Sequence, residues 1–153
     1  MPLKKVIMKI WLTKIPVALL AISLSAVSCK TSQGDPSTLP KDISERPANE
    51  SSQRYDEAQL DKLKASIESL ASQEKCTNAS EWTFSPLGSK ACGGPITYIA
   101  YPKKLEATIL PVIEEYTANM SEYNKKYNIT SDCMMAAEPR SIKCMNGKAE
   151  LVY

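Results

Sequence analysis

Histidine is absent from all 153 residues of the chain. Without an imidazole, the protein has no histidine general base, no histidine-assisted nucleophile and no zinc site that needs a nitrogen ligand. The five cysteines include no Cys-x-x-Cys pair, the spacing that is typical of a thiolate metal site. We therefore expect neither a metal nor another cofactor.

Positive charge is also scarce once the N-terminal segment is set aside. The chain holds 19 basic and 17 acidic residues, but four of the lysines lie among the first 14 residues, which contain no acidic residue. Residues 29–153 therefore carry 15 basic against 17 acidic side chains, a net charge of −2. No basic patch remains to hold a nucleic-acid backbone, and we expect no nucleic-acid partner.

The sequence has no hydrophobic run of transmembrane length. The basic start is followed by residues 15–28, which are 14 uncharged and mostly apolar residues, whereas a spanning helix needs about 20. A basic start, a short apolar region and small residues at its end are the parts of a secretory signal. Residues 1–28 are therefore predicted to be a signal peptide.

The signal ends in Ser-Ala-Val-Ser-Cys at residues 25–29, which resembles the lipobox of bacterial lipoproteins. In that family a cysteine behind small residues is lipidated and becomes the mature N-terminus. The resemblance implies that Cys29 is the lipid attachment site, with acyl chains such as palmitate as the anchor. Ala26 departs from the leucine that is more common there. Ala26 and Ser28 also satisfy the small-x-small rule of ordinary secretory cleavage, so plain secretion stays open.

The cysteine count favours lipidation. Five cysteines leave one unpaired in an oxidising compartment, and lipidation of Cys29 would leave four that can pair. We therefore expect an exported protein that is anchored to a membrane at the cell envelope. The periplasmic face of the outer membrane is the default, and a soluble secreted protein is the alternative.

Residues 29–55 are predicted to be a disordered tether. Residues 30–54 contain three prolines, many polar residues and no aromatic residue, so they cannot bury enough apolar surface to offset the entropy of ordering. From Asp56 the pattern becomes that of an amphipathic helix ending near Cys76, with Asp56 as its N-cap and Gln59 as the capping-box partner. The folded domain is thus placed at 56–153.

Further elements follow from periodicity and turn chemistry. Apolar residues recur every three or four positions over 105–127, which predicts a second helix with a kink at Pro111. Alternation predicts a strand near 81–85, and β-rich composition favours a strand at 96–101 over a short helix with Pro95 at its first position. Asn146-Gly147 suits a type I′ turn, so the C-terminus is predicted to be a hairpin in which Lys143 faces Glu150.

The fold class is therefore α+β, with two amphipathic helices on a small antiparallel sheet that ends in the C-terminal hairpin. Residues 132–135 could add a third strand. In an exported chain the four remaining cysteines are expected to form two disulfides, and they are Cys76, Cys92, Cys133 and Cys144. Three pairings are open, and 76–92 with 133–144 is favoured because each of these bridges would join elements that are neighbours in sequence.

Several short motifs occur in a recognisable order. They are Lys-Ala-Cys-Gly-Gly-Pro at 90–95, Tyr98, Tyr101, Ser-Asp-Cys at 131–133 and Cys-Met-Asn-Gly-Lys at 144–148. This pattern is similar to that of a family of small exported proteins and lipoproteins, over roughly residues 76–153. The resemblance implies an exported setting and this domain boundary, and it implies no particular activity.

No catalytic residue is assigned. Ser89 and Lys90 would point to opposite faces of an extended chain, and Glu114 and Glu115 would diverge on a helix, so neither pair suits nucleophilic or acid-base chemistry. The candidate binding residues are aromatic side chains and a rigid turn, and they are Trp82, Gly93, Gly94, Pro95 and Tyr98. The same residues would equally serve a small core.

These observations favour a non-enzymatic module that binds another protein or envelope macromolecule, such as an inhibitor of an incoming protease or lysozyme. One alternative is a small envelope enzyme that uses carboxylates or a free cysteine. Another is a purely structural envelope component.

Overall fold

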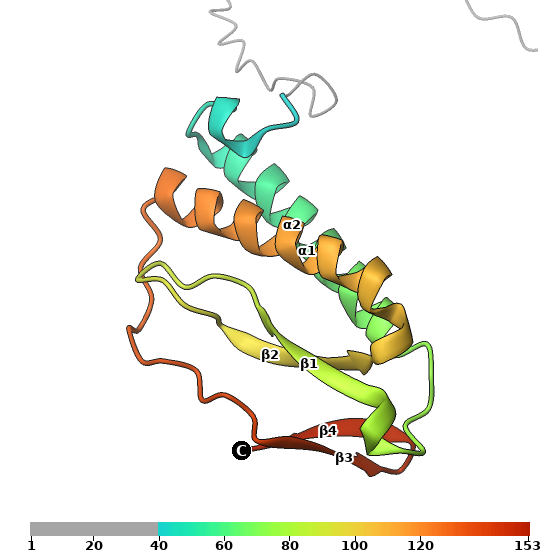
Figure 1. Cartoon of the computed structure of the whole chain (residues 1–153). Helices are drawn as coiled ribbons and strands as arrows, with labels where there is room; N and C mark the ends of the chain where they lie inside the picture. The colour runs from blue at the N-terminus through green and yellow to red at the C-terminus, as the bar shows by residue number, and fades with distance from the viewer. Residues whose placement is uncertain (1–39) are drawn as a thin grey trace, which may run out of the picture. The chain divides into compact units, whose positions relative to one another are not determined.

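A computed structural model describes residues 40–153, which belong to one compact unit (Figure 1). The predicted signal peptide, Cys29 and the first part of the predicted tether lie outside the described residues. The main elements are α1 (Glu50–Ala71), β1 (Trp82–Leu87), β2 (Thr97–Pro102), α2 (Glu106–Lys126), β3 (Ser141–Met145) and β4 (Lys148–Val152). Three short 3₁₀ turns accompany them, namely η2 (Ile43–Glu45), η3 (Ala79–Glu81) and η4 (Lys103–Leu105).

Helix α1 begins seven residues earlier than predicted, because its N-cap is residue 49 and not residue 56. Asn49 is its N-cap, and its side chain accepts a hydrogen bond of 2.9 Å from the backbone N–H of Ser52. The prediction that Asp56 caps the helix is therefore wrong. The predicted tether also extends too far, because residues 40–55 contain η2 and the first turns of α1.

Asp56 instead lies at the centre of a buried charge cluster. Its carboxylate is fully buried, forms an ion pair with Arg46, and accepts from Lys126 Nζ at 3.0 Å and from the Tyr127 hydroxyl at 2.8 Å. Arg46 also donates to the backbone carbonyls of Pro40 and Lys41. This cluster ties residues 40–46 to the C-terminal end of α2, which explains why the chain is ordered before α1.

The two helices run antiparallel and cover one face of the β1–β2 hairpin (Figure 1). Their apolar stripes meet there as predicted, with Pro111 inside α2. The buried apolar cluster between the helices and the hairpin consists of Leu60, Ile67, Ala71, Leu87, Tyr101, Ile109, Ile113, Tyr116 and Tyr123. Within residues 40–153, no helix is long and apolar enough to cross a membrane.

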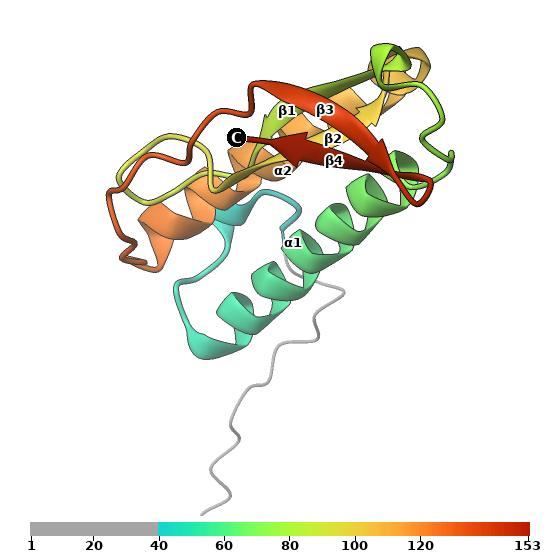
Figure 2. The same cartoon turned by 90° about the horizontal axis from the view of Figure 1, so that it is seen from below.

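The α+β class is confirmed, but the strands form two separate two-stranded antiparallel sheets. The β3–β4 hairpin lies on the side of β1–β2 that faces away from the helices (Figure 2). Its predicted register is confirmed, since Lys143 pairs with Glu150 and their charged groups lie 3.6 Å apart. Asn146 and Gly147 both have positive φ, as the predicted turn requires.

The predicted third strand at 132–135 does not form. Lys90 Nζ donates a hydrogen bond to the backbone carbonyl of Met134 at 2.6 Å. The N–H of Met134 donates to the side chain of Asp132 at 3.3 Å. These backbone groups are therefore satisfied by side chains, and the segment has no strand partner.

Two disulfides are present, but the favoured pairing is wrong, because Cys76 bonds Cys144 and Cys92 bonds Cys133. The backbone N–H of Cys76 donates to the carbonyl of Gly147 at 2.8 Å, which brings the chain after α1 to the β3–β4 turn. Proximity in sequence did not predict the pairing, because each disulfide joins segments that come together only in the folded chain.

Candidate binding site

The loop between β1 and β2, residues 88–96, is closed on itself and is called the Cys92 loop below. The Lys90 N–H donates to the Gly94 carbonyl at 2.9 Å, and the Gly93 N–H donates back to the Lys90 carbonyl at 3.0 Å. Gly93 and Gly94 have φ of +92° and +80°, which L-residues with a side chain rarely adopt. The two glycines are therefore what allows this compact turn.

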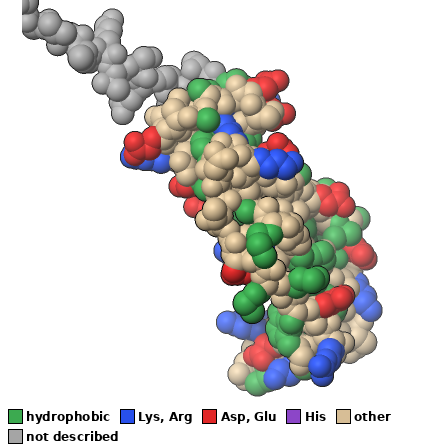
Figure 3. All heavy atoms as spheres, turned by 90° about the vertical axis from the view of Figure 1, so that its left-hand side faces the viewer, with side chains coloured by type: hydrophobic (Ala, Val, Ile, Leu, Met, Phe, Trp, Pro, Cys, Tyr) green, Lys and Arg blue, Asp and Glu red, His purple; other side chains and the backbone are tan. Residues whose placement is uncertain are grey.

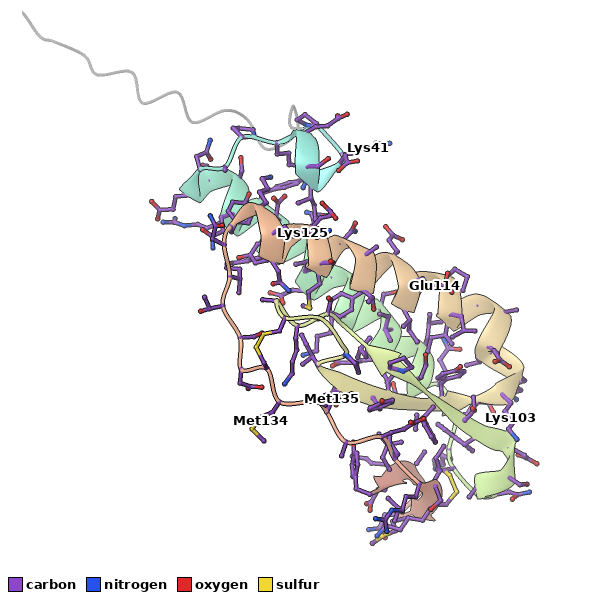
Figure 4. All side chains as sticks on the ribbon, turned by 60° about the vertical axis from the view of Figure 1, so that its left-hand side comes forward. Lys41, Lys103, Glu114, Lys125, Met134 and Met135 are labelled. Carbon is purple, nitrogen blue, oxygen red and sulfur yellow. A yellow bond between two sulfur atoms is a disulfide. The ribbon has the colours of Figure 1, made fainter. Side chains whose placement is uncertain are left out.

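The loop is fastened to the irregular segment between α2 and β3, residues 128–140, called the strap below. The Cys92–Cys133 disulfide joins them covalently (Figure 4), and the Ala91 N–H donates to Ser131 Oγ at 3.1 Å. Lys90 Nζ donates to Asp132 Oδ1 at 2.6 Å. A disulfide, hydrogen bonds and an ion pair thus hold loop and strap together.

Helix α2 holds the other side of the loop. Asn124 Nδ2 donates to the Ser89 carbonyl at 2.8 Å, and the Gly88 N–H donates to Thr117 Oγ1 at 3.2 Å. The loop is therefore fixed between α2 and the strap.

The Lys90 side chain is held in place by contacts within the protein. It is 15% exposed and is held by Asp132 and by the Met134 carbonyl. The hydrogen bond from the Lys90 ammonium, together with its charge, lowers the pKa of Asp132. Ser89 Oγ donates only to the carbonyl of Lys90, at 3.3 Å, so the two side chains form no nucleophile pair. Glu114 and Glu115 are both exposed on α2.

The structure brings together only some of the predicted binding residues. Gly94 and Pro95 line a cleft of about 610 Å³ between the loop and α2, and Gly93 lies exposed beside them. Tyr98, on the adjoining strand, packs edge-on against Phe84 with ring centroids 6.0 Å apart. Trp82 is buried at the far end of the β1–β2 hairpin, opposite Pro102, and is a core residue.

A second cleft, of about 550 Å³, opens between α1 and the Cys92 loop and is called the α1–loop cleft below. Its apolar lining comes from Leu60, Ile96, Tyr116, Met120, Tyr123 and Ile129. Its charged lining comes from Glu57, Asp61, Lys90 and Asp132, so three carboxylates face one ammonium and the formal charge is −2.

The tyrosines of this cleft respond to their surroundings. Burial raises the pKa of Tyr116, and the nearby carboxylates of Asp61 and Glu68 raise it further. Burial also raises the pKa of Tyr123, whose hydroxyl donates to Glu57 and accepts from Gln53 Nε2 at 3.0 Å. Both phenols therefore stay neutral, and the free negative charge of the cleft belongs to its carboxylates.

Exposed apolar side chains surround the loop and strap. Met134 and Met135 on the strap are 76% and 90% exposed, and Ile96 at the end of the loop is 45% exposed. Figure 3 shows hydrophobic side chains gathered on the face toward which these segments lie, and Figure 4 shows Met134 pointing away from the domain. Flexible methionines on an exposed surface are typical of contacts with other proteins.

The sequence reasoning missed the α1–loop cleft and the two exposed methionines. Met134-Met135 was visible as an apolar pair, but residues 132–135 were interpreted as a possible strand, and that interpretation hid the signal. Glu57 and Asp61 carried no sequence signal for a cleft, because any solvent-exposed helix face has acidic residues of this kind.

In the part of the chain that the structure covers, no group of three or more acidic or cysteine side chains is placed to hold a metal ion. Comparison with protein-family models, with curated proteins and with solved structures found no match to this chain.

Proposed function

We propose that this protein is a lipid-anchored lipoprotein of the cell envelope, and that its folded domain is a non-catalytic module that binds another macromolecule. The observation that carries the proposal is the Cys92 loop, which is held by a disulfide, by the strap and by α2 next to exposed apolar side chains. A preset loop loses little conformational entropy on binding, which raises affinity for a given contact area.

An inhibitor of an incoming hydrolase, such as a protease or lysozyme, is the sharpest form of this proposal. Such inhibitors present a rigid loop to the target with little change in shape. The cysteine form of the envelope-enzyme alternative would need a free cysteine. The described domain offers none, because all four of its cysteines form disulfides. The candidate carboxylates Glu114 and Glu115 are both exposed on α2.

The test uses residues 33–153, the compact unit that contains the described domain. Trypsin-like, subtilisin-like and lysozyme-type hydrolases are titrated with it, and residual activity and complex formation on size exclusion are recorded. Saturable inhibition of one class, weakened tenfold or more by Met134→Glu with Met135→Glu, is expected. Met145→Glu on β3, also an exposed methionine, is the matched control. Equal inhibition by the double variant of the strap and by the Met145→Glu control would contradict the proposed binding surface.

The lipid anchor is proposed for Cys29. It is supported by the lipobox-like residues 25–29 and by the pairing of the other four cysteines with one another. In a bacterial host, Cys29→Ala should release the protein from the membrane fraction or leave the unprocessed form, and metabolic labelling with palmitate should be lost. Membrane association and mobility that do not change would contradict lipidation, and a soluble wild-type protein would indicate plain secretion.

A further inference from the structure

We propose that the α1–loop cleft receives an arginine or lysine side chain of the partner protein. This inference rests on the proposed binding function and names the chemistry of the partner at that site. It concerns the cleft of about 550 Å³ whose walls come from α1, α2, the Cys92 loop and the strap.

The shape and lining of the cleft suit a long side chain with a cationic end. Leu60, Tyr116 and Met120 provide an apolar floor, on which the methylene groups of a lysine or arginine can pack. Glu57 and Asp61 lie one helical turn apart on α1, at exposed positions of the wall. A stem on the floor would therefore bring its charged end to the carboxylates.

The charges of the cleft favour a cation over an anion or a neutral group. Lys90 is the only cation of the lining, and it is already bound to Asp132 and to the Met134 carbonyl. Asp61 has no ion-pair or hydrogen-bond partner among the described residues. Glu57 accepts from Tyr123, and a carboxylate has lone pairs left for a further donor. Negative charge is thus available on the α1 side.

The surface around the cleft indicates a protein as the source of that cation. Ile96 belongs to the lining and is also exposed, and the strap that supplies Asp132 continues into Met134 and Met135. A basic residue flanked by apolar residues would place its charge in the cleft and its neighbours on these side chains. A charged anchor surrounded by apolar contacts is a common plan of protein interfaces.

The experiment uses two short peptides as probes, acetyl-Leu-Arg-Leu-amide and acetyl-Leu-Glu-Leu-amide, with ¹⁵N-labelled residues 33–153. The arginine peptide should shift amide resonances of residues 57–61, 89–91 and 116–124, and the glutamate peptide should not. Glu57→Gln with Asp61→Asn should weaken arginine-peptide binding about fivefold, as expected for two solvent-accessible ion pairs. Binding of the arginine peptide to this double variant should also depend less on salt concentration than binding to the wild-type protein does.

Glu114→Gln with Glu115→Gln is the matched control, because it removes the same charge from α2 positions that do not line this cleft. Thermal unfolding of each variant checks the fold. Equal affinity of the cleft variant and the control, equal binding of both peptides, or shifts on another face would overturn the assignment. Hydrolase inhibition that survives Glu57→Gln with Asp61→Asn would also overturn it while leaving the proposed function standing. Peptide binding in the cleft without any inhibition would support the cleft and contradict the inhibitor role.

Discussion

At the scale of single residues, the most constrained side chain is Asp56. It is fully buried and faces two cations, Arg46 and Lys126, whose side chains are 4% and 10% exposed. Taking these charges out of water is unfavourable, and their mutual contacts, the Tyr127 hydroxyl and the backbone carbonyls that Arg46 and Lys126 reach offset that penalty. The cluster therefore specifies how residues 40–46 dock, and its integrity depends on every member.

Asp56→Asn should destabilise the domain by about 3–5 kcal/mol, because it leaves two buried cations without their carboxylate. Asp61→Asn, an exposed change of the same kind on the same helix, should stay within about 0.5 kcal/mol. Urea unfolding of both variants measures the difference. Similar midpoints for the two would show that the cluster contributes little.

The same residue shows where reading the sequence fails at this scale. Asp56 looked like an N-cap because an acidic residue preceded an apolar stripe and Gln59 followed three positions later. Its true partners, Arg46 and Lys126, are 10 and 70 residues away in sequence. Local spacing cannot report a buried ion pair, since its members meet only after the helices have packed.

At the scale of elements, the sequence predicted well wherever a local rule decides the outcome. Asn146-Gly147 set the hairpin register because its turn needs two positive φ values, and apolar periodicity located both helices. The strap could not be predicted in this way. Its backbone is fixed by Lys90 and by the Cys92–Cys133 bridge, which are tertiary contacts.

The Cys92 loop offers a matched test at this scale. Gly88 and Gly93 both have positive φ, but a Cβ on Gly88 would lie 3.2 Å from the tips of Ile96 and Met120, whereas one on Gly93 would meet nothing within 4 Å. Each change to alanine should cost about 1–2 kcal/mol of backbone strain. Gly88→Ala should cost about 1 kcal/mol more through overpacking.

Chemical denaturation of Gly88→Ala and Gly93→Ala measures that difference directly. Amide shifts in the second variant should stay near residue 93, while the first should also perturb α2 around Met120. A Gly93→Ala variant that is the less stable of the two would contradict the packing of the loop against α2.

At the scale of the whole molecule, the two disulfides differ in their accessibility. Cys76 is 3% exposed and Cys144 is half-buried, whereas Cys92 and Cys133 both lie at the surface. Thiol-disulfide exchange requires the attacking thiolate to reach a sulfur atom, so access controls its rate. The two bridges, with sequence separations of 68 and 41 residues, should therefore be reduced in a fixed order.

A mild dithiol should reduce Cys92–Cys133 first and leave Cys76–Cys144 intact in the folded protein. Closing a loop of this length is worth about 4 kcal/mol on the chain-entropy model, and 1 kcal/mol shifts the melting temperature of a domain of this size by about 4–8 °C. Loss of one bridge should thus lower the melting temperature by about 10 °C or more.

Alkylation followed by peptide mapping identifies the reduced pair. In residues 33–153 Trp82 is the only tryptophan, so its fluorescence follows unfolding of this domain alone. Cys92→Ser with Cys133→Ser should reproduce the shift. Labelling of Cys76 and Cys144 first, or melting temperatures that match before and after reduction, would contradict this order of reduction or its contribution to stability.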